Sequence, residues 1–377
     1  MTAFVLPPYP YDRLKPLAEI AAAKPGGMVD LSIGTPFDAP PPAVIEALGT
    51  SGAERGYPPS IGTEAFRQAA ARWLDRRLGA VVDPGIQIGA CVGTKEFVAS
   101  APLHLRLRTP DRDTVLYPEI SYPSYAMGAS LAGCRAVPVP VDDQWRLDLG
   151  RIDPGDAERA VCLWVNTPGN PTGGLDDLGA AAAWGRDHGV PVLSDECYVE
   201  FTWAGAVPPG RVHGGRTILE HGTEGVLAVH SLSKRSNLAG VRAGFYAGDA
   251  ELVHWLREIR KHAGAMVPGP VQAAAIVAFD DDAHVDVQRA TYLRRLELLA
   301  SILAHAGYDT VLPGGAFYLW VPAPDGDAWA MAADLAERGG ALVSPGEFYG
   351  QAGAGYVRIA AVQPDDRIAL LGERLGS

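Results

Sequence analysis

Short apolar segments that alternate with helical stretches constrain the fold of this chain more than any other feature. Residues 114–117, 160–166, 190–195, 226–231 and 243–247 are predicted strands, and residues 94–105, 122–132 and 175–188 are predicted helices. Continuous apolar strands that alternate with helices indicate a largely parallel sheet covered on both faces. Such sheets bind ligands at the carboxyl ends of their strands. We therefore predict an α/β fold with a binding site at that edge.

A change of pattern near residue 269 indicates a second domain. Residues 271–279 and 291–306 are predicted helices, and residues 317–322, 342–343 and 357–359 are short predicted strands. The chain has 377 residues, more than one compact core holds. We predict an N-terminal arm at 1–45 that contributes to the small domain, a large domain at 46–269 and a small α+β domain at 270–377.

The net charge of −12 disfavours two classes of partner, because an acidic chain repels nucleic-acid phosphates and anionic membranes. Cys91, Cys134, Cys162 and Cys197 form no CxxC pair and have no zinc-type spacing, so we predict no metal site and expect reduced thiols. The first residues resemble no secretory signal, and no apolar run approaches the roughly 20 residues that span a bilayer. We expect a soluble cytoplasmic protein.

The first candidate for chemistry is Lys234, in the segment HSLSKRSNLAGVRAGF that starts at residue 230. A lysine that forms a Schiff base must lose its proton, and partial desolvation near other cations lowers its pKa toward that condition. The hydroxyls of Ser231 and Ser233 and the guanidinium of Arg242 suit a phosphate group. Taken alone, a lysine after Ser-x-Ser is more often a solvated surface residue.

The second candidate is Asp195, in the sequence SDECY at the end of a predicted strand. A carboxylate there can bind a metal, a ribose or a protonated ring nitrogen, and it can equally cap a helix. Tyr198, three residues further on, is a hydrogen-bond donor for an oxygen on such a ring. Cys197 lies between them and is predicted to be a small core residue.

Two loops complete the predicted site. The sequence NTPGNPTG, which starts at Asn166, holds two prolines and two glycines after a strand and predicts a rigid loop, although an ordinary turn has the same composition. Gly93, Thr94 and Lys95 open a predicted helix, whose backbone N–H groups can bind a phosphate. Any helix N-cap has a similar sequence, and the Lys95 side chain is predicted to be solvated.

These motifs, in this order, resemble the fold-type I aminotransferases that depend on pyridoxal 5'-phosphate (PLP), the aspartate aminotransferase superfamily. The resemblance runs from Ile33 to Ala360. It implies a large PLP-binding domain with a mostly parallel, seven-stranded sheet flanked by helices, and a smaller α+β domain. It also implies amino acid and keto acid substrates and a homodimer with shared active sites.

The resemblance assigns a role to each matching residue. Lys234 corresponds to the Schiff-base lysine that also moves the proton, and Asp195 to the partner of the ring nitrogen. Asn166 and Tyr198 correspond to the residues that bind the 3'-oxygen of the ring, and Tyr122 to the aromatic residue that stacks on it. The residues that correspond to the phosphate site are Gly93, Thr94, Lys95 through its backbone, Ser231, Ser233 and Arg242.

Three further residues correspond to functional positions of the superfamily. Arg358 matches the arginine that binds the substrate α-carboxylate, an interaction to which Asn166 also contributes, and Gly34 matches the segment that closes over that carboxylate. Tyr57 matches a tyrosine that reaches the cofactor phosphate of the partner subunit. Three aromatic residues are predicted either to line the substrate cleft or to pack in the core or a dimer interface: Trp203, Phe348 and Tyr349.

A narrower resemblance concerns the segments 230–245 and 260–273, which are similar to actinobacterial N-succinyldiaminopimelate aminotransferases of lysine biosynthesis. That resemblance implies exchange of an amino group between glutamate and N-succinyl-2-amino-6-oxopimelate. The chain departs from it at Val241, where a tyrosine is common. Two alternatives stay open: another PLP reaction of secondary metabolism, such as elimination or oxidation, and transamination of another substrate. A transcription regulator with an aminotransferase-like domain is disfavoured, since such proteins carry a helix-turn-helix module and the charge opposes DNA binding.

Overall fold

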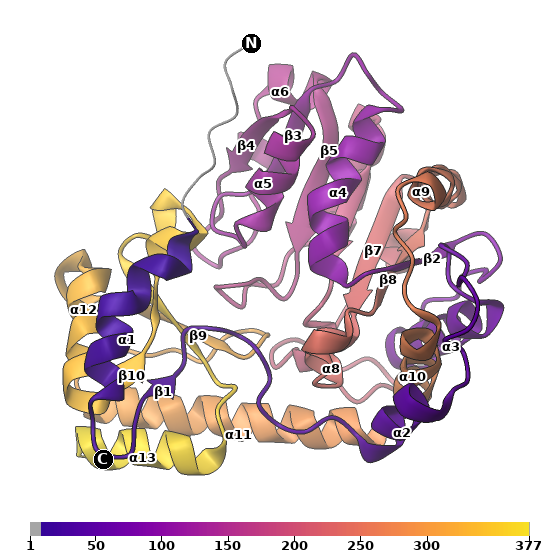
Figure 1. The fold of residues 1–377 in the computed structure, drawn as a ribbon. Coiled ribbons are helices and arrows are strands. Elements are labelled where there is room, and N and C mark those ends of the chain that lie inside the picture. The colour runs from indigo at the N-terminus through magenta and orange to yellow at the C-terminus, as the bar shows by residue number, and fades with distance from the viewer. Residues whose placement is uncertain (1–8, 377) are drawn as a thin grey trace.

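A computed structural model describes residues 9–376 and places a seven-stranded mixed sheet at the centre of the large domain (Figure 1). The strand order is β2-β8-β7-β6-β5-β3-β4. The strands are β2 (Ile88–Cys91), β3 (Thr114–Pro118), β4 (Arg135–Val139), β5 (Ala160–Asn166), β6 (Val192–Asp195), β7 (Val226–Ser231) and β8 (Gly244–Gly248). All neighbours are parallel except β8, which pairs antiparallel with both β2 and β7. The predicted α/β fold is confirmed.

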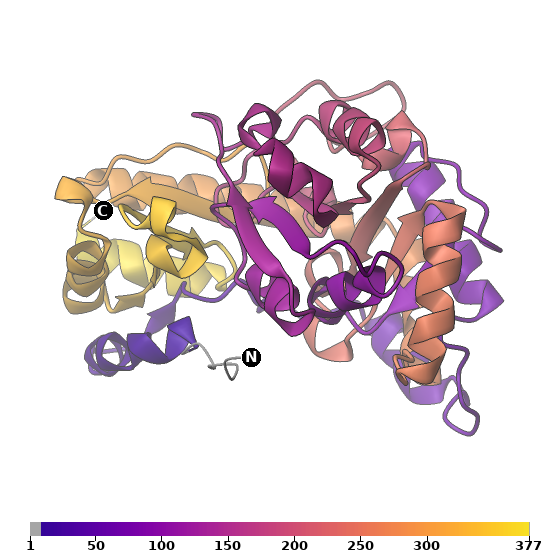
Figure 2. The ribbon, with the colours of Figure 1, turned by 90° about the horizontal axis from the view of Figure 1, so that it is seen from above.

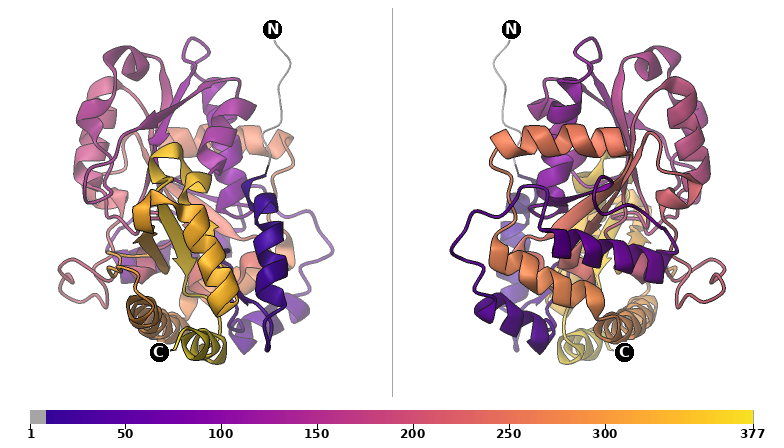
Figure 3. Two further views of the ribbon diagram at one scale, coloured as in Figure 1. Left: turned by 90° about the vertical axis from the view of Figure 1, so that its left-hand side faces the viewer. Right: turned by 90° about the vertical axis from the view of Figure 1, so that its right-hand side faces the viewer.

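Helices cover both faces of this sheet, as continuous apolar strands require. One face packs on α3 (Glu64–Leu78), α7 (Leu178–His188) and α10 (Gly269–Asp280). The other face packs on α4 (Thr94–Arg106), α5 (Ser124–Leu131) and α9 (Ala250–His262) (Figures 1 and 3). Strands β5, β6 and β7 are buried at every position, which explains why their sequences are apolar throughout.

The C-terminal part contains a three-stranded antiparallel sheet, β11-β12-β9, and a parallel pair, β1-β10. These strands are β1 (Val29–Asp30), β9 (Tyr318–Pro322), β10 (Ala341–Leu342), β11 (Ser344–Pro345) and β12 (Tyr356–Ala360). The helices around them are α1 (Lys15–Ala22), α11 (Ala283–His305), α12 (Ala328–Asp334) and α13 (Asp365–Leu375) (Figure 2). Since β1 pairs with β10, the N-terminal segment and the C-terminal segment lie side by side.

Two helices connect the C-terminal part to the large sheet. Helix α10 packs against α2 (Pro42–Thr50) and α3, so it lies beside the large sheet. Helix α11 begins at Ala283, earlier than the predicted start at residue 291, and runs below both parts of the molecule (Figure 1). The domain boundaries at 45/46 and 269/270 stay predictions. Within residues 9–376, no helix is both long and apolar enough to cross a bilayer.

Candidate active site

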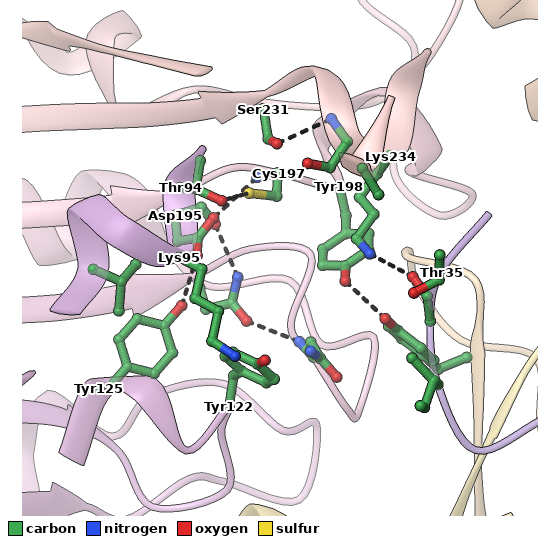
Figure 4. Close-up of a pocket in the computed structure, with 18 of the residues that line it drawn as sticks. Thr35, Thr94, Lys95, Tyr122, Tyr125, Asp195, Cys197, Tyr198, Ser231 and Lys234 are labelled. Carbon is green, nitrogen blue, oxygen red and sulfur yellow. Dashed lines mark hydrogen bonds between the residues drawn. The ribbon is translucent and has the colours of Figure 1, made fainter. Parts of the chain in front are cut away.

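A cavity of about 430 Å³ lies where β5, β6 and β7 end, beside the C-terminal sheet (Figure 4). It lies at the edge of the sheet where the strand pattern predicts a ligand. The predicted site residues that line it are Gly34, Thr94, Lys95, Tyr122, Asn166, Asp195, Tyr198, Ser231, Ser233, Lys234, Arg242 and Arg358. Two predicted residues do not line it, Gly93 and Tyr57.

Lys234 projects into the cavity from α8 (Leu232–Arg235), the short helix that follows β7 directly. The hydroxyl of Ser231 caps this helix by accepting a hydrogen bond from the Ser233 N–H at 3.1 Å. The Lys234 ammonium donates to the carbonyl oxygen of Gly34. Burial, assisted by the nearby charges of Arg358 and Arg242, lowers the pKa of Lys234 to about 8. A lysine with this pKa is a usable amine near neutral pH.

Asp195 ends β6 and is buried. Its carboxylate accepts hydrogen bonds from the Tyr125 hydroxyl at 2.9 Å and from the Cys197 N–H at 3.2 Å. Burial raises the pKa of Asp195, and these two donors together with the charge of Lys234 oppose that shift. A buried carboxylate on the cavity wall is a partner for a cationic group of a ligand.

Asn166 connects this carboxylate to the loop that begins at the end of β5. Its side-chain amide donates to the backbone oxygen of Asp195 at 2.9 Å and accepts from the Asn170 N–H at 2.8 Å. These bonds fix the loop against β6. The Asn166 side chain therefore connects the end of β6 to the loop residue Asn170.

The groups suited to a phosphate also line the cavity: the hydroxyls of Thr94, Ser231 and Ser233, and the guanidinium of Arg242. Gly93 lies directly behind that guanidinium, and a Cβ at this position would come within 2.3 Å of Arg242 Nη2. Gly93 also has a φ of 73°, which a larger residue rarely adopts. Its contribution is therefore to let Arg242 approach the start of α4.

Arg358 lies on β12 with 2% of its surface exposed. Its guanidinium donates to Asn170 Oδ1 at 2.8 Å and to the Ser32 carbonyl at 2.5 Å. The rings of Tyr318 and Tyr349 lie 4.3 and 4.6 Å from its Cζ atom. Burial opposes the charge, but the surrounding tyrosine hydroxyls outweigh burial and raise the pKa of Arg358.

No carboxylate within residues 9–376 forms a salt bridge with Arg358. Buried charges in proteins are normally paired. A buried guanidinium that borders a cavity and lacks an anionic partner can pair with the carboxylate of a ligand.

Sequence reasoning missed several residues that line the cavity: Tyr9, Tyr11, Tyr125, Asn170 and Tyr318. Tyr318 forms a hydroxyl–hydroxyl contact of 2.8 Å with Tyr198, and burial raises the pKa of Tyr198 well above its usual range. A Cβ at Gly34 would come within 1.9 Å of the Tyr318 hydroxyl. The signal for Asn170 was available, since it is the second asparagine of the loop motif.

Other predicted residues have different surroundings. Cys197, predicted to be in the core, lines the cavity and donates to the Thr94 hydroxyl at 3.1 Å. Trp203, Phe348 and Tyr349 do not line the cavity, and Phe348 and Tyr349 are buried in one hydrophobic cluster. Val241 also lies outside it and packs against the core of the large domain, so the valine itself is not part of the cavity wall. Tyr57 is 96% exposed.

The donor set fits PLP. The cofactor needs a carboxylate for its ring nitrogen, an amine for its aldehyde and cationic and hydroxyl groups for its phosphate. Asp195, Lys234 and Arg242 supply these groups on the walls of one cavity. The Gly93 position, which a Cβ would fill, is part of the same arrangement.

Comparison with known proteins supports the same class. Residues 26–374 match the family model described as aminotransferase class I and II. The chain therefore belongs to the class I and II aminotransferases, which use PLP as their cofactor.

Individual relatives match over nearly the full chain. It is 43% identical to the 4-dedimethylamino-4-oxo-anhydrotetracycline transaminase of Streptomyces rimosus, over 98% of this chain and 99% of the relative. It is 42% identical to a probable aminotransferase of Mycobacterium tuberculosis, over 98% of this chain and 85% of the relative. A solved structure described as a probable N-succinyldiaminopimelate aminotransferase from Thermus thermophilus is 30% identical, covers 97% of this chain and 98% of that chain, and superposes with a TM-score of 0.83.

Proposed function

We propose that this aminotransferase exchanges an amino group between an α-amino acid, with glutamate as the donor, and a 2-oxo acid. The single observation that carries the proposal is Arg358, a buried guanidinium on the same cavity as Lys234 and without an anionic partner among residues 9–376. It supplies the bidentate site that an α-carboxylate requires.

The residues of the cavity have distinct roles in this proposal. Lys234, as a free amine, removes the proton from the substrate α-carbon and returns it later. Asp195 holds a proton at the ring nitrogen of the cofactor, and Arg358 orients the substrate through its carboxylate. When bound, PLP supplies a ring that takes up the charge left at the α-carbon. Asn166, Tyr198 and Tyr122 position the ring, and Thr94, Ser231, Ser233 and Arg242 hold its phosphate.

The test is a panel of amino donors and 2-oxo acids, assayed with the PLP-loaded enzyme. The proposal predicts that each turnover releases one 2-oxoglutarate from glutamate and one new amino acid. Release of ammonia would indicate elimination, and formation of hydrogen peroxide would indicate oxidation. Either product in stoichiometric amount, without amino group exchange, would overturn the proposal.

For the acceptor we propose N-succinyl-2-amino-6-oxopimelate. Support comes from the segments 230–245 and 260–273 and from the described activity of the Thermus thermophilus structure. A second candidate is the 4-oxo group of an anhydrotetracycline, favoured by the 43% identity to the Streptomyces rimosus transaminase. The ratio of kcat/KM for the two acceptors, measured with glutamate as donor, decides between them.

We also propose a homodimer in which Tyr57 reaches the active site of the partner subunit. Tyr57 is 96% exposed, so its side chain is accessible to a partner subunit, which supports this proposal. The cytoplasmic location stays a prediction.

A further inference from the structure

Tyr11 is a residue of the cavity to which neither the sequence motifs nor the proposed function gives a role. It lies in the 3-10 turn Pro10–Leu14, far in sequence from Arg358 and Lys234, and it is half-buried. Its hydroxyl lies 2.8 Å from the hydroxyl of Tyr349 and 3.4 Å from Nη2 of Arg358. The turn thus brings a neutral hydrogen-bonding group to the guanidinium.

Three contacts hold the turn in this place. Leu14 is buried, with 3% of its surface exposed, in a cluster that includes Phe348. Arg13 forms a salt bridge of 2.7 Å with Glu347 and stacks over the Trp329 ring at 4.8 Å. The Tyr11 hydroxyl is therefore presented by an anchored segment.

The hydrogen bonds of Arg358 differ in length in a way that matters for ligand binding. The bonds to Asn170 and to the Ser32 carbonyl are 2.8 and 2.5 Å, whereas the contact with the Tyr11 hydroxyl is 3.4 Å. Hydrogen bonds of this type normally measure about 2.7–3.2 Å. The contact with Tyr11 is thus the weakest of the three and the one that an incoming carboxylate oxygen replaces at least cost.

We infer that the Tyr11 hydroxyl is a ligand of the substrate α-carboxylate. A carboxylate oxygen that pairs with Nη2 of Arg358 comes next to this hydroxyl, which then donates a hydrogen bond to the carboxylate. Without substrate, the Tyr11 and Tyr349 hydroxyls share a hydrogen bond of 2.8 Å in which either oxygen can be the donor. The inference rests on the proposed function, because it assumes that Arg358 binds the α-carboxylate.

The alternative is that Tyr11 only packs. Its ring lies 5.6 Å from the Phe348 ring, so it contributes to the anchoring of the turn. Tyr11→Phe separates the two roles, because it keeps the ring and removes the hydroxyl. Tyr356→Phe is the matched control: Tyr356 lies on β12, the strand of Arg358, and its ring stacks on Trp320 at 5.2 Å.

The experiment measures the binding of glutarate, a dicarboxylate without an amino group, to the PLP-loaded enzyme through the visible spectrum of the cofactor. Since hydrogen bonds to charged groups are worth more than neutral ones, the Kd is expected to rise roughly tenfold in Tyr11→Phe. The Kd is expected to stay unchanged in Tyr356→Phe. In turnover assays the KM for glutamate is expected to rise by a similar factor, with kcat changed by less than about twofold.

A Tyr11→Phe enzyme with unchanged Kd and KM would overturn the inference and leave the proposed function standing. A fall in kcat at constant KM would also overturn it. If the wild-type enzyme transaminates no amino acid, the proposed function fails, and the glutarate Kd still decides whether Tyr11 binds a carboxylate. A wild-type enzyme that binds no carboxylate would overturn both.

Discussion

Lys234 and Asp195 carry opposite charges in one buried cavity, and burial disfavours both charged forms. It lowers the pKa of Lys234 to about 8 and raises the pKa of Asp195. The two shifts have different consequences. A larger fraction of the lysine is free amine near neutral pH, whereas the donors Tyr125 and Cys197 oppose the rise in the pKa of the carboxylate.

The pKa of Lys234 predicts how cofactor attachment depends on pH. The amine is the reactive form, and its fraction rises with pH until the pH exceeds the pKa. The rate at which PLP attaches to the apoenzyme is therefore expected to rise up to about pH 8 and to level off above it. Stopped-flow absorbance measures this rate. A rate that keeps rising toward pH ~10, near the ordinary lysine pKa, would contradict the prediction.

Removal of the Tyr125 hydroxyl tests the support of Asp195. Tyr125→Phe deletes a donor 2.9 Å from the carboxylate and leaves the ring in place. We expect kcat/KM to fall on the order of tenfold, because a hydrogen bond to a charged group is lost. Tyr117→Phe, on the half-buried Tyr117 of β3, is the control and should be unchanged. Equal activity of the two variants would show that Asp195 does not need this donor.

The sequence predicts residues of the site to the extent that each lies in a local motif. Asp195 is the last residue of an apolar strand and Lys234 lies three residues after the end of another, so their place at the sheet edge could be predicted. Tyr125 and Tyr318 could not, because their contacts with Asp195 and Tyr198 join residues far apart in the chain. No sequence motif predicts Tyr11 as a site residue, because its inferred role depends on how the N-terminal turn packs against Glu347 and Phe348.

At the scale of elements, α8 must hold Lys234 still. The next residue, Arg235, is buried and contacts Glu200, which also accepts hydrogen bonds from Trp73 at 2.8 Å, Arg77 at 2.7 Å and His213 at 3.1 Å. Burial would raise the pKa of Glu200, but His213, Arg235 and Arg77 outweigh it and lower the pKa well below its usual range. The cluster links α8 to α3.

Substitution of Glu200 is expected to destabilise the fold. Glu200→Gln removes the charge that balances Arg77 and Arg235, and breaking a buried pair of this kind costs about 3–5 kcal/mol. Denaturant unfolding measures the change. The control is Arg72→Ala, which breaks the exposed pair with Asp280 and is expected to cost less than about 1 kcal/mol. If both variants lose a similar free energy of unfolding, the buried Glu200 cluster contributes no more to stability than an exposed ion pair does.

The elements also show which parts of the fold were predictable. The bounds of β5 and β7 agree with prediction because both strands are apolar and buried throughout. Strand β4 was missed, since it lies at the sheet edge and carries Arg135 and Pro138, which are exposed. The early start of α11 escaped prediction because its first turns are polar and face the large domain, where Asp286 pairs with Arg77.

At the scale of the whole molecule, the cavity depends on segments from both ends of the chain. Pairing of β1 with β10 places Gly34 beside Lys234, and β12 brings Arg358 to the same cavity. The proposed homodimer adds a further segment, since Tyr57 belongs to the large domain of the other subunit. The cavity is thus assembled by tertiary structure and, in the proposal, by quaternary structure.

Mixing two variants tests whether active sites are shared. Lys234→Ala and Tyr57→Ala are each expected to lower activity strongly. In a shared-site dimer, a heterodimer of the two contains one unaltered site, so co-expression is expected to restore roughly a quarter of the wild-type sites. Activity no greater than the sum of the separate variants would contradict shared sites, as would a monomeric mass in sedimentation.

The most direct test of the account is to locate the lysine that carries the cofactor. Borohydride reduction of the PLP-loaded enzyme fixes the cofactor to its lysine, and peptide mass spectrometry then identifies the modified residue. The chain has five lysines, Lys15, Lys24, Lys95, Lys234 and Lys261. Of these, Lys95 and Lys234 line the cavity. The account predicts the added mass on Lys234 alone. Modification of Lys95 in its place, or of no lysine, would contradict it.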